Sequence, residues 1–232
     1  MQGQSDPRTP FVIGIILLGV VLLGGIVWAV AYAPSDSSDR GRTDVNVSFN
    51  DENDPTLGPS DAPVVLRIFG DYQCPACKAA EPGVTYVRRT YADRLKIVWN
   101  DFPLQSLHRN ARNAANAARC AEEQGKFWDM HDALYDFQSD WSEKSNPRDD
   151  FHALASRVQL NVDAFDSCYD DKKYDAKVYA DVQEGNANSV DSTPTFFINK
   201  RKITGILTPA EWDKELQAVL GPPLTPAATS TK

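Results

Sequence analysis

The motif Cys74-Pro75-Ala76-Cys77 constrains this chain more than any other feature, because it lies between a strand pattern and a helix pattern. The apolar run Val64–Phe69 before it is typical of a buried strand, and the residues from 78 onward favour a helix. The first cysteine then lies at a helix N-terminus, where unpaired backbone N–H groups and the helix dipole favour a thiolate over a thiol. Cys77 follows one turn later, close enough to form a disulfide with Cys74. This arrangement predicts thiol–disulfide exchange.

Two plainer interpretations of the motif compete with redox chemistry. A C-x-x-C pair can be half of a zinc site, but a closed tetrahedral site needs four ligands. The two remaining cysteines lie far off in the sequence and the three histidines show no ligand spacing, so we predict no metal. A purely structural disulfide also fits, although a bridge that encloses two residues removes little entropy from the unfolded chain. Cysteine spacing favours the redox interpretation and leaves the structural one open.

Composition and charge argue against several other classes of function. The 232 residues include 24 Lys and Arg against 32 Asp and Glu, which gives a net charge of −8 at pH 7. A nucleic-acid-binding domain would instead cluster basic residues on one face. The sequence also shows no glycine-rich phosphate loop, no Ser/His/Asp grouping and no internal repeat.

The N-terminal part contains an uncharged apolar segment, residues 11–33. As a helix it would span roughly 34 Å, enough for a bilayer core of about 30 Å. A cleaved signal peptide is the alternative, because Ala31-Tyr32-Ala33 resembles a cleavage site. However, the apolar run is longer than the ~7–15 residues of a signal-peptide core, and Pro34 would follow the cut. We expect a cytoplasmic N-terminus at 1–10 and an uncleaved single-pass transmembrane anchor at 11–33.

The distribution of charges does not decide on which side of the membrane the remainder lies. Arg8 precedes the span, whereas Arg40 and Arg42 follow it, so the positive-inside rule leans slightly toward the opposite orientation. All four cysteines lie beyond the span, and an even set of cysteines suits an oxidising compartment better than the cytosol. We therefore expect the domain on the extracytoplasmic side of the cytoplasmic membrane.

The rest of the chain divides into a linker, one folded domain and a tail. Residues 34–60, rich in Ser, Asp, Asn, Gly and Pro, are expected to form a flexible linker, and residues 221–232 a disordered tail. Residues 61–220 alternate strand and helix patterns. Strands are expected at Val64–Phe69, Lys96–Trp99, Thr195–Ile198 and Lys202–Thr204, and helices at Cys74–Tyr91, Arg109–Gln124, Phe127–Phe137, Asp149–Val158, Asp163–Asp171, Tyr174–Asn188 and Pro209–Leu220.

The order of these elements predicts an α/β fold. A strand–helix–strand unit followed by a hairpin and a helix is the minimum that makes a mixed four-stranded sheet with helices on both faces. The helices from about residue 105 to 171 interrupt this order as an insert.

The chain resembles the DsbA-like branch of the thioredoxin superfamily. The resemblance is carried by residues 58–63 and 69–77 around the motif, by 118–128 in the insert, and by 190–199 leading into the third strand. It covers about residues 61–220 and implies a thioredoxin fold with an inserted helical subdomain.

The resemblance also assigns a role to the dipeptide Thr193-Pro194. In this superfamily the matching proline is cis and lies beside the active disulfide, and a cis X-Pro bond is found in only about 5–6% of such bonds in folded proteins. The implied role is to present the backbone of Thr193 to a bound substrate chain. An ordinary proline at the start of an edge strand is the alternative.

The resemblance implies distinct roles within the motif. Cys74 would be the solvent-facing nucleophile and Cys77 the buried resolving cysteine, with Pro75 at the first helical position, where its missing N–H costs nothing. DsbA has a histidine in place of Ala76, so we expect Cys74 to be less acidic than the DsbA thiol, whose pKa is about 3.5, and the couple to be less oxidising. Asp71 fits two roles equally, as a proton acceptor for the pair or as a residue that caps the turn.

Cys120 and Cys168 lie at opposite ends of the helical block. A structural disulfide that fixes the insert would close a loop of roughly 50 residues and contribute on the order of 4 kcal/mol in the chain-entropy model. A second redox-active pair that passes electrons to the motif is the alternative.

These observations predict a membrane-tethered protein disulfide oxidoreductase that acts on secreted or cell-envelope polypeptides. No cofactor is expected, because the cysteine pair itself carries the electrons. The resemblance implies reoxidation by a quinone-linked membrane partner, and the charge predicts no nucleic-acid partner. Three alternatives remain: a disulfide reductase or isomerase of the same fold, a tethered chaperone-like binding module with an inert disulfide, and a glutathione-linked relative.

Overall fold

The computed structural model describes residues 43–221, which contain one mixed sheet with the strand order β1-β6-β5-β3-β4-β2. β3 and β4 are parallel, and β5 pairs antiparallel with both β3 and β6. A parallel pair needs a crossover connection, which here is a helix. The four inner strands are β3 (Val64–Gly70), β4 (Leu95–Asp101), β5 (Thr195–Ile198) and β6 (Arg201–Thr204).

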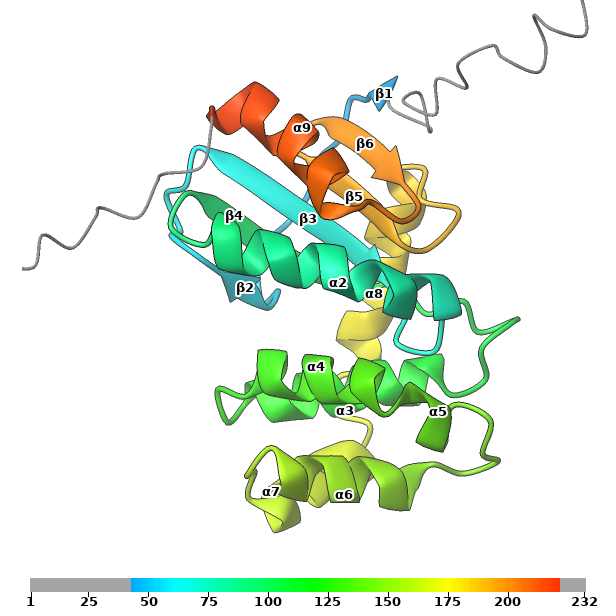
Figure 1. Ribbon diagram of the computed structural model, residues 1–232. Coiled ribbons are helices and arrows are strands. Elements are labelled where there is room, and N and C mark those ends of the chain that lie inside the picture. Colours follow the sequence, from blue (N-terminus) through cyan, green and yellow to red (C-terminus); the bar gives the residue numbers. More distant parts are fainter. Residues whose placement is uncertain (1–42, 222–232) are drawn as a thin grey trace, which may run out of the picture. The chain divides into compact units, whose positions relative to one another are not determined.

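Helices cover both faces of the sheet, and further helices form a separate layer (Figure 1). α2 and α9 lie on one face of the sheet, α8 lies on the other, and the insert between β4 and α8 contributes α3 to α7. The helices are α2 (Pro75–Thr90), α3 (Ala111–Glu122), α4 (Phe127–Asp136), α5 (Gln138–Trp141), α6 (Arg148–Arg157), α7 (Val162–Asp170), α8 (Asp175–Ala187) and α9 (Pro209–Leu220).

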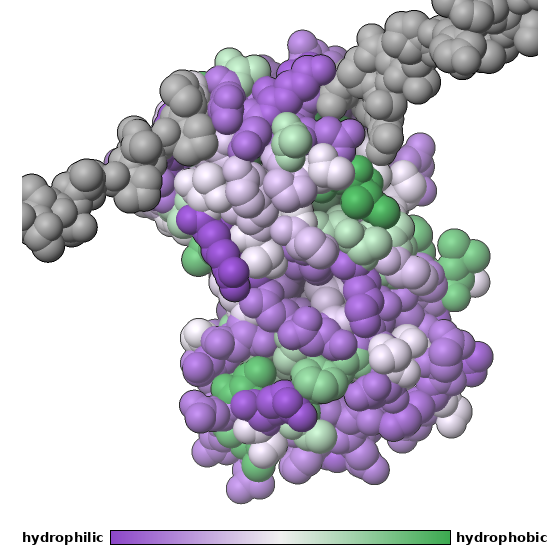
Figure 2. Space-filling model, viewed as in Figure 1, coloured by the Kyte–Doolittle hydropathy of each residue, from purple (hydrophilic) through white to green (hydrophobic). Residues whose placement is uncertain are grey.

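The side chains of β3 point alternately to the two faces of the sheet, which explains why both faces are covered by helices. Leu66 and Ile68 are buried in the large cluster that includes α2 and α9, whereas Phe69 belongs to a second cluster on the opposite face. Successive side chains of a strand point to opposite faces, so this strand supplies apolar residues to two cores. Apolar areas on the face shown in Figure 2 are small and scattered, which fits a domain whose apolar side chains lie mostly inside.

The strand register places three chain segments at one edge of the domain. Gly70 pairs with Asp101 at the ends of β3 and β4, and Phe69 pairs with Thr195 at the beginning of β5. The turn into α2 therefore lies beside the loop that leads into β5. This edge carries the cysteine motif.

The predicted thioredoxin-like fold is confirmed, with two differences at the N-terminal side. The sheet has six strands in the described residues instead of four, because the two-residue strands β1 (Thr43–Asp44) and β2 (Thr56–Leu57) pair with β6 and β4. The flexible linker was predicted to extend to residue 60, which is wrong for residues 43–60. Phe49 packs on Phe69 and Phe197, with ring centroids 6.0 and 5.1 Å apart.

The linker prediction failed because polar composition concealed an alternating pattern. Val45, Val47 and Phe49 are partly buried against the second core, and the residues between them are exposed. Such alternation is what a segment lying along a surface requires.

Several predictions concern residues outside the described part of the chain. They are the cytoplasmic N-terminus at 1–10, the transmembrane anchor at 11–33, the first part of the linker, and the tail after Gly221. Among residues 43–221, none of the helices has the length and apolar character that a membrane span requires.

Candidate active site

Cys74 lies at the N-cap of α2, directly after the turn that follows β3. Its φ and ψ of −69° and 123° are extended, its N–H donates to the carbonyl of Asp71 (3.1 Å), and its carbonyl accepts from Lys78 (3.2 Å). Pro75 begins the helix, where an N–H would have no intrahelical partner. The sulfur is thus placed where the free N–H groups of the first turn converge.

The pKa values of the two thiols of the motif are shifted in opposite directions. The pKa of Cys74 is lowered to about 5, mainly because the Cys77 thiol donates a hydrogen bond to its sulfur. The backbone N–H groups of Cys77 and Ala76 and the side chain of Thr193 lower this pKa further, whereas burial opposes the shift. The pKa of Cys77 is raised well above its ordinary value, first by burial and then by the neighbouring Cys74. At pH 7 a thiol with a pKa of about 5 is roughly a hundredfold more often charged than neutral. Cys74 is therefore the more acidic thiol of the pair.

Burial distinguishes the two cysteines less than the resemblance implied. Both are free thiols, and 7% of Cys74 is exposed against 2% of Cys77. Cys74 was expected to face solvent, but the loop before β5 covers it. Its sulfur lies 3.6 Å from the carbonyl oxygen of Thr193.

The Thr193-Pro194 bond is cis, and the structure brings this dipeptide beside the motif although 119 residues separate Thr193 from Cys74. A proline here has no N–H that would compete for a neighbouring acceptor. The arrangement leaves the backbone before β5 close to the sulfur of Cys74.

The carboxylate of Asp71 is fully engaged in local hydrogen bonds. The residue is 1% exposed, its Oδ1 accepts from the N–H of Gln73 (2.8 Å), and its Oδ2 accepts from the N–H of Leu104 (2.9 Å) and lies 2.7 Å from Nδ1 of His108. The sequence left two roles open for Asp71, a proton acceptor for the cysteine pair or a residue that caps the turn. This geometry favours the role of a turn-capping residue. Asp71 joins the approach to the motif to the loop that follows β4.

Sequence analysis missed two glutamines that support the motif. The amide Nε2 of Gln138, at the start of α5 in the insert, donates to the carbonyls of Tyr72 (2.7 Å) and Cys74 (3.2 Å). Gln73 links the same turn to Asn110 and Ser142. Glutamine has no diagnostic spacing, and the partner of Gln138 lies 64 residues away. No local signal would have identified it.

Glu81, His131 and Asp132 bring three groups that can bind metals within 4.8 Å of one another. They already satisfy each other and their neighbours. Oε2 of Glu81 lies 3.4 Å from Nε2 of His131, whose Nδ1 lies 3.2 Å from the hydroxyl of Tyr72. Asp132 forms a two-point ion pair with Arg88. We assign no metal to this cluster.

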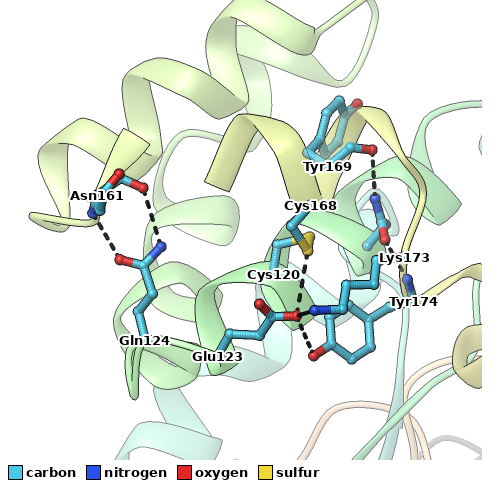
Figure 3. Close-up of a disulfide and its surroundings, with 9 residues drawn as sticks. Cys120, Glu123, Gln124, Asn161, Cys168, Tyr169, Lys173 and Tyr174 are labelled. Carbon is cyan, nitrogen blue, oxygen red and sulfur yellow. Dashed lines mark hydrogen bonds and ion pairs between the residues drawn. A yellow bond between two sulfur atoms is a disulfide. The ribbon is translucent and has the colours of Figure 1, made fainter. Parts of the chain in front are cut away.

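Cys120 and Cys168 form a disulfide that joins α3 to α7 within the insert (Figure 3). Beside it, Oε1 of Glu123 accepts from the Lys173 ammonium (2.6 Å) and from the Tyr174 hydroxyl (2.8 Å). These interactions tie the segment that follows α7 to the end of α3. The disulfide therefore lies where it restrains the insert.

Comparison with known proteins identifies the fold and the family of this arrangement. Residues 50–218 match the family model described as Thioredoxin. The oxidised BdbD structure from Bacillus subtilis has a TM-score of 0.67 and 22% identity, and the match covers 76% of this chain and 97% of that chain. α-DsbA1 from Wolbachia pipientis has a TM-score of 0.66 and 22% identity, with 75% and 94% covered. The catalytic domain of Proteus mirabilis ScsC has a TM-score of 0.58 and 18% identity, with 74% and 89% covered.

Curated relatives with higher identity are much longer proteins. The chain is 35% identical over 168 residues to Na⁺/H⁺ antiporter NhaA 3 of Salinispora tropica, which covers 72% of this chain and 25% of the relative. It is 34% identical over 168 residues to Na⁺/H⁺ antiporter NhaA 1 of Mycolicibacterium vanbaalenii, with 70% and 25% covered. The chain thus spans about a quarter of the length of these relatives.

Proposed function

The chain belongs to the thioredoxin family, and we propose that it is a protein disulfide oxidoreductase whose Cys74 and Cys77 exchange disulfides with cysteine-containing polypeptides. One observation carries the proposal: Cys74 lies at the N-cap of α2 with Cys77 one turn later, an arrangement in which the pKa of Cys74 is lowered to about 5 while that of Cys77 is raised. An inert structural pair has no need of such a difference, whereas an exchange reaction needs one charged, attackable sulfur and one protonated sulfur.

The reaction in the oxidase direction begins with the Cys74–Cys77 disulfide. A substrate thiolate attacks Sγ of Cys74, a new disulfide joins substrate and enzyme, and the electron pair of the old bond leaves on Sγ of Cys77. A second substrate thiolate then attacks the substrate sulfur of the mixed disulfide. The substrate leaves oxidised, and Cys74 leaves as the stabilised thiolate.

The acidity of Cys74 supports the oxidase direction. Its pKa of about 5 lies between those of thioredoxin, about 7, and DsbA, about 3.5. A more stable thiolate stabilises the reduced enzyme and so makes its disulfide a stronger oxidant. Equilibration with glutathione measures the potential directly. A value near that of thioredoxin, about −270 mV, would make the protein a reductase or isomerase instead.

We propose that the domain works on the extracytoplasmic side of the cytoplasmic membrane, anchored by residues 11–33. The disulfide between Cys120 and Cys168 supports an oxidising compartment. Substrates would then be secreted or cell-envelope polypeptides, and a quinone-linked membrane protein would reoxidise the pair. Labelling intact cells with a membrane-impermeant thiol reagent tests the location, because protection of the reduced cysteines until lysis contradicts it.

Trapping of mixed disulfides tests the proposed function. Cys77→Ala removes the resolving thiol, so covalent complexes with substrates accumulate and disappear on reduction. Cys74→Ser is the matched control and should trap nothing. If Cys77→Ala traps no polypeptide and Cys74 titrates like an ordinary thiol, the protein is a binding module with an inert cysteine pair.

A further inference from the structure

The inserted helices reach the backbone of Cys74 through one side chain, that of Gln138 at the start of α5. Its amide Nε2 donates to the carbonyl of Tyr72 (2.7 Å) and to the carbonyl of Cys74 (3.2 Å), and the residue is buried. The Cys74 carbonyl also accepts from the N–H of Lys78, which closes the first turn of α2. A single amide therefore bonds two carbonyls of the turn that carries the acidic thiol.

The short helix α5 is itself held in place, which fixes the position of Gln138. At its last residue, the indole Nε1 of the fully buried Trp141 donates to a backbone carbonyl of α4 (3.0 Å). Directly after it, the carbonyl of Ser142 accepts from the side-chain amide of Gln73 (2.7 Å). The helix is thus bonded to the turn before α2 at its first residue and again just beyond its end. Gln138 therefore stays beside the Cys74 carbonyl.

Hydrogen bonds to these two carbonyls affect the sulfur in two ways. The backbone N–H groups of Ala76 and Cys77 help to stabilise the Cys74 thiolate, so the backbone must hold Sγ near them. Without the amide, the buried carbonyl of Tyr72 would lose this donor, and rotating its peptide group toward water would displace the residues that follow. A carbonyl oxygen also carries a partial negative charge that repels a thiolate, and an N–H directed at the oxygen offsets part of that repulsion.

We propose that Gln138 is a positioning residue of the exchange reaction, which holds the backbone of Tyr72 and Cys74 so that the thiolate of Cys74 is favoured. The role rests on the proposed function, and it makes the insert part of the redox couple. In the reduced enzyme Cys74 carries a charge, whereas in the oxidised enzyme its sulfur is neutral, so the amide stabilises the reduced form more. A more stable reduced form makes the disulfide a stronger oxidant. Gln138 therefore shifts the couple in the oxidase direction.

Gln138→Met tests the proposal, because methionine keeps the length of the side chain and lacks the amide. In the reduced full-length protein the thiolate is followed by its ultraviolet absorbance as pH changes, and the redox equilibrium is measured against glutathione at pH 7. One hydrogen bond changes an equilibrium by about tenfold, so the pKa of Cys74 should rise by about one unit. The redox equilibrium should shift about tenfold toward the disulfide, which lowers the potential by about 30 mV. Gln138→Asn, whose amide is one methylene shorter, should give an intermediate shift.

Gln124→Met is the matched control, because Gln124 also lies in the insert and makes two hydrogen bonds there (Figure 3). Its side chain donates to the carbonyl of Asn161 (3.2 Å) and accepts from the N–H of the same residue (2.8 Å). Both variants should unfold at a lower urea concentration than the wild type, but only Gln138→Met should change the pKa of Cys74 and the potential. A purely structural role of Gln138 would destabilise the oxidised and the reduced protein equally and leave the potential unchanged.

The outcomes distinguish the role of Gln138 from the proposed function. If Cys74 of the wild type titrates near the ordinary thiol value of about 8.5, the proposed function fails. If the wild type is acidic and Gln138→Met keeps its pKa and its potential, the assignment of Gln138 is wrong and the proposed function stands. If Gln138→Met does not fold, Gln138→Glu decides in the same way, because it has the same length and at pH 7 its carboxylate has no proton to donate.

Discussion

The acidity of Cys74 makes a prediction about folding stability as well as about reactivity. In the unfolded reduced chain its pKa is about 8.5, whereas in the folded protein it is lowered to about 5. The unfolded chain therefore binds more protons between these values, and the folded state gains stability as pH rises. The contribution is fully present above about pH 8.5 and is lost as pH falls through about 5.

The displacement of the pKa sets the size of this contribution. A shift of about 3.5 units at about 1.36 kcal/mol per unit gives an upper bound of about 5 kcal/mol. Solvent screens part of it, because Cys74 lies at the edge of the domain, so we expect about half. Between about pH 5 and pH 8 the contribution should grow by about 2 kcal/mol. Cys77 contributes little in this window, because its pKa is raised in the folded state and is about 8.5 in the unfolded chain, so its thiol is mostly protonated in both states below about pH 8.

Urea unfolding of the reduced wild type and of reduced Cys74→Ser, under the same reductant at several pH values, isolates the effect. Other groups titrate in both proteins, so they cancel in the difference between the two unfolding free energies. That difference should favour the wild type increasingly as pH rises. A difference that stays constant from about pH 5 to pH 8 would refute the claim that folding acidifies this sulfur.

Three further predictions concern other parts of the domain. Removing the disulfide by Cys120→Ala with Cys168→Ala should lower the free energy of unfolding by about 4 kcal/mol, because the loop spans 48 residues, and an unchanged urea midpoint would contradict the restraint. Gly70→Ala should cost about 1–3 kcal/mol, because the new Cβ would lie 2.1 Å from the ring of Trp99; a wild-type melting temperature would show that the ring moves freely. Burial raises the pKa of Asp181 to about 7, so its protonated form favours folding and this contribution is lost as pH rises through about 7. Asp181→Asn should make stability less dependent on pH between about 4 and 7, and equal slopes in wild type and variant would exclude this.

Most of the fold could be predicted because its elements carry their own periodicity. The bounds of β3, β5 and α2 each lie within one residue of the predicted bounds. The two-residue strands β1 and β2 could not be predicted, because a strand of that length has no period. They form through pairing with β6 and β4, which are distant in sequence.

The buried polar interactions were also beyond prediction. Arg119 is fully buried, and it donates to Asp101 on β4 (2.7 Å) and to Asp181 on α8 (2.6 Å). These partners lie 18 and 62 residues away, and a charged residue in a helix pattern normally indicates the solvent-exposed face. The next residue, Cys120, was identified because cysteines are few and their spacing is informative. Arg119 thus ties α3 to the sheet and to α8 by ion pairs, and the next residue, Cys120, ties α3 to α7 by a disulfide.

The environment of Cys74 shows why the four-residue motif alone does not determine the acidity of its thiol. The N-cap position follows from local sequence, but Thr193, whose side chain contributes to the lowered pKa of Cys74, lies 119 residues away. The amide that holds the Cys74 carbonyl belongs to Gln138 in the insert, 64 residues away. A peptide containing the same four residues would lack both partners and the burial that keeps Cys77 protonated. The acidity of Cys74 is therefore a property of the assembled domain, and the insert contributes to it by holding the turn in place.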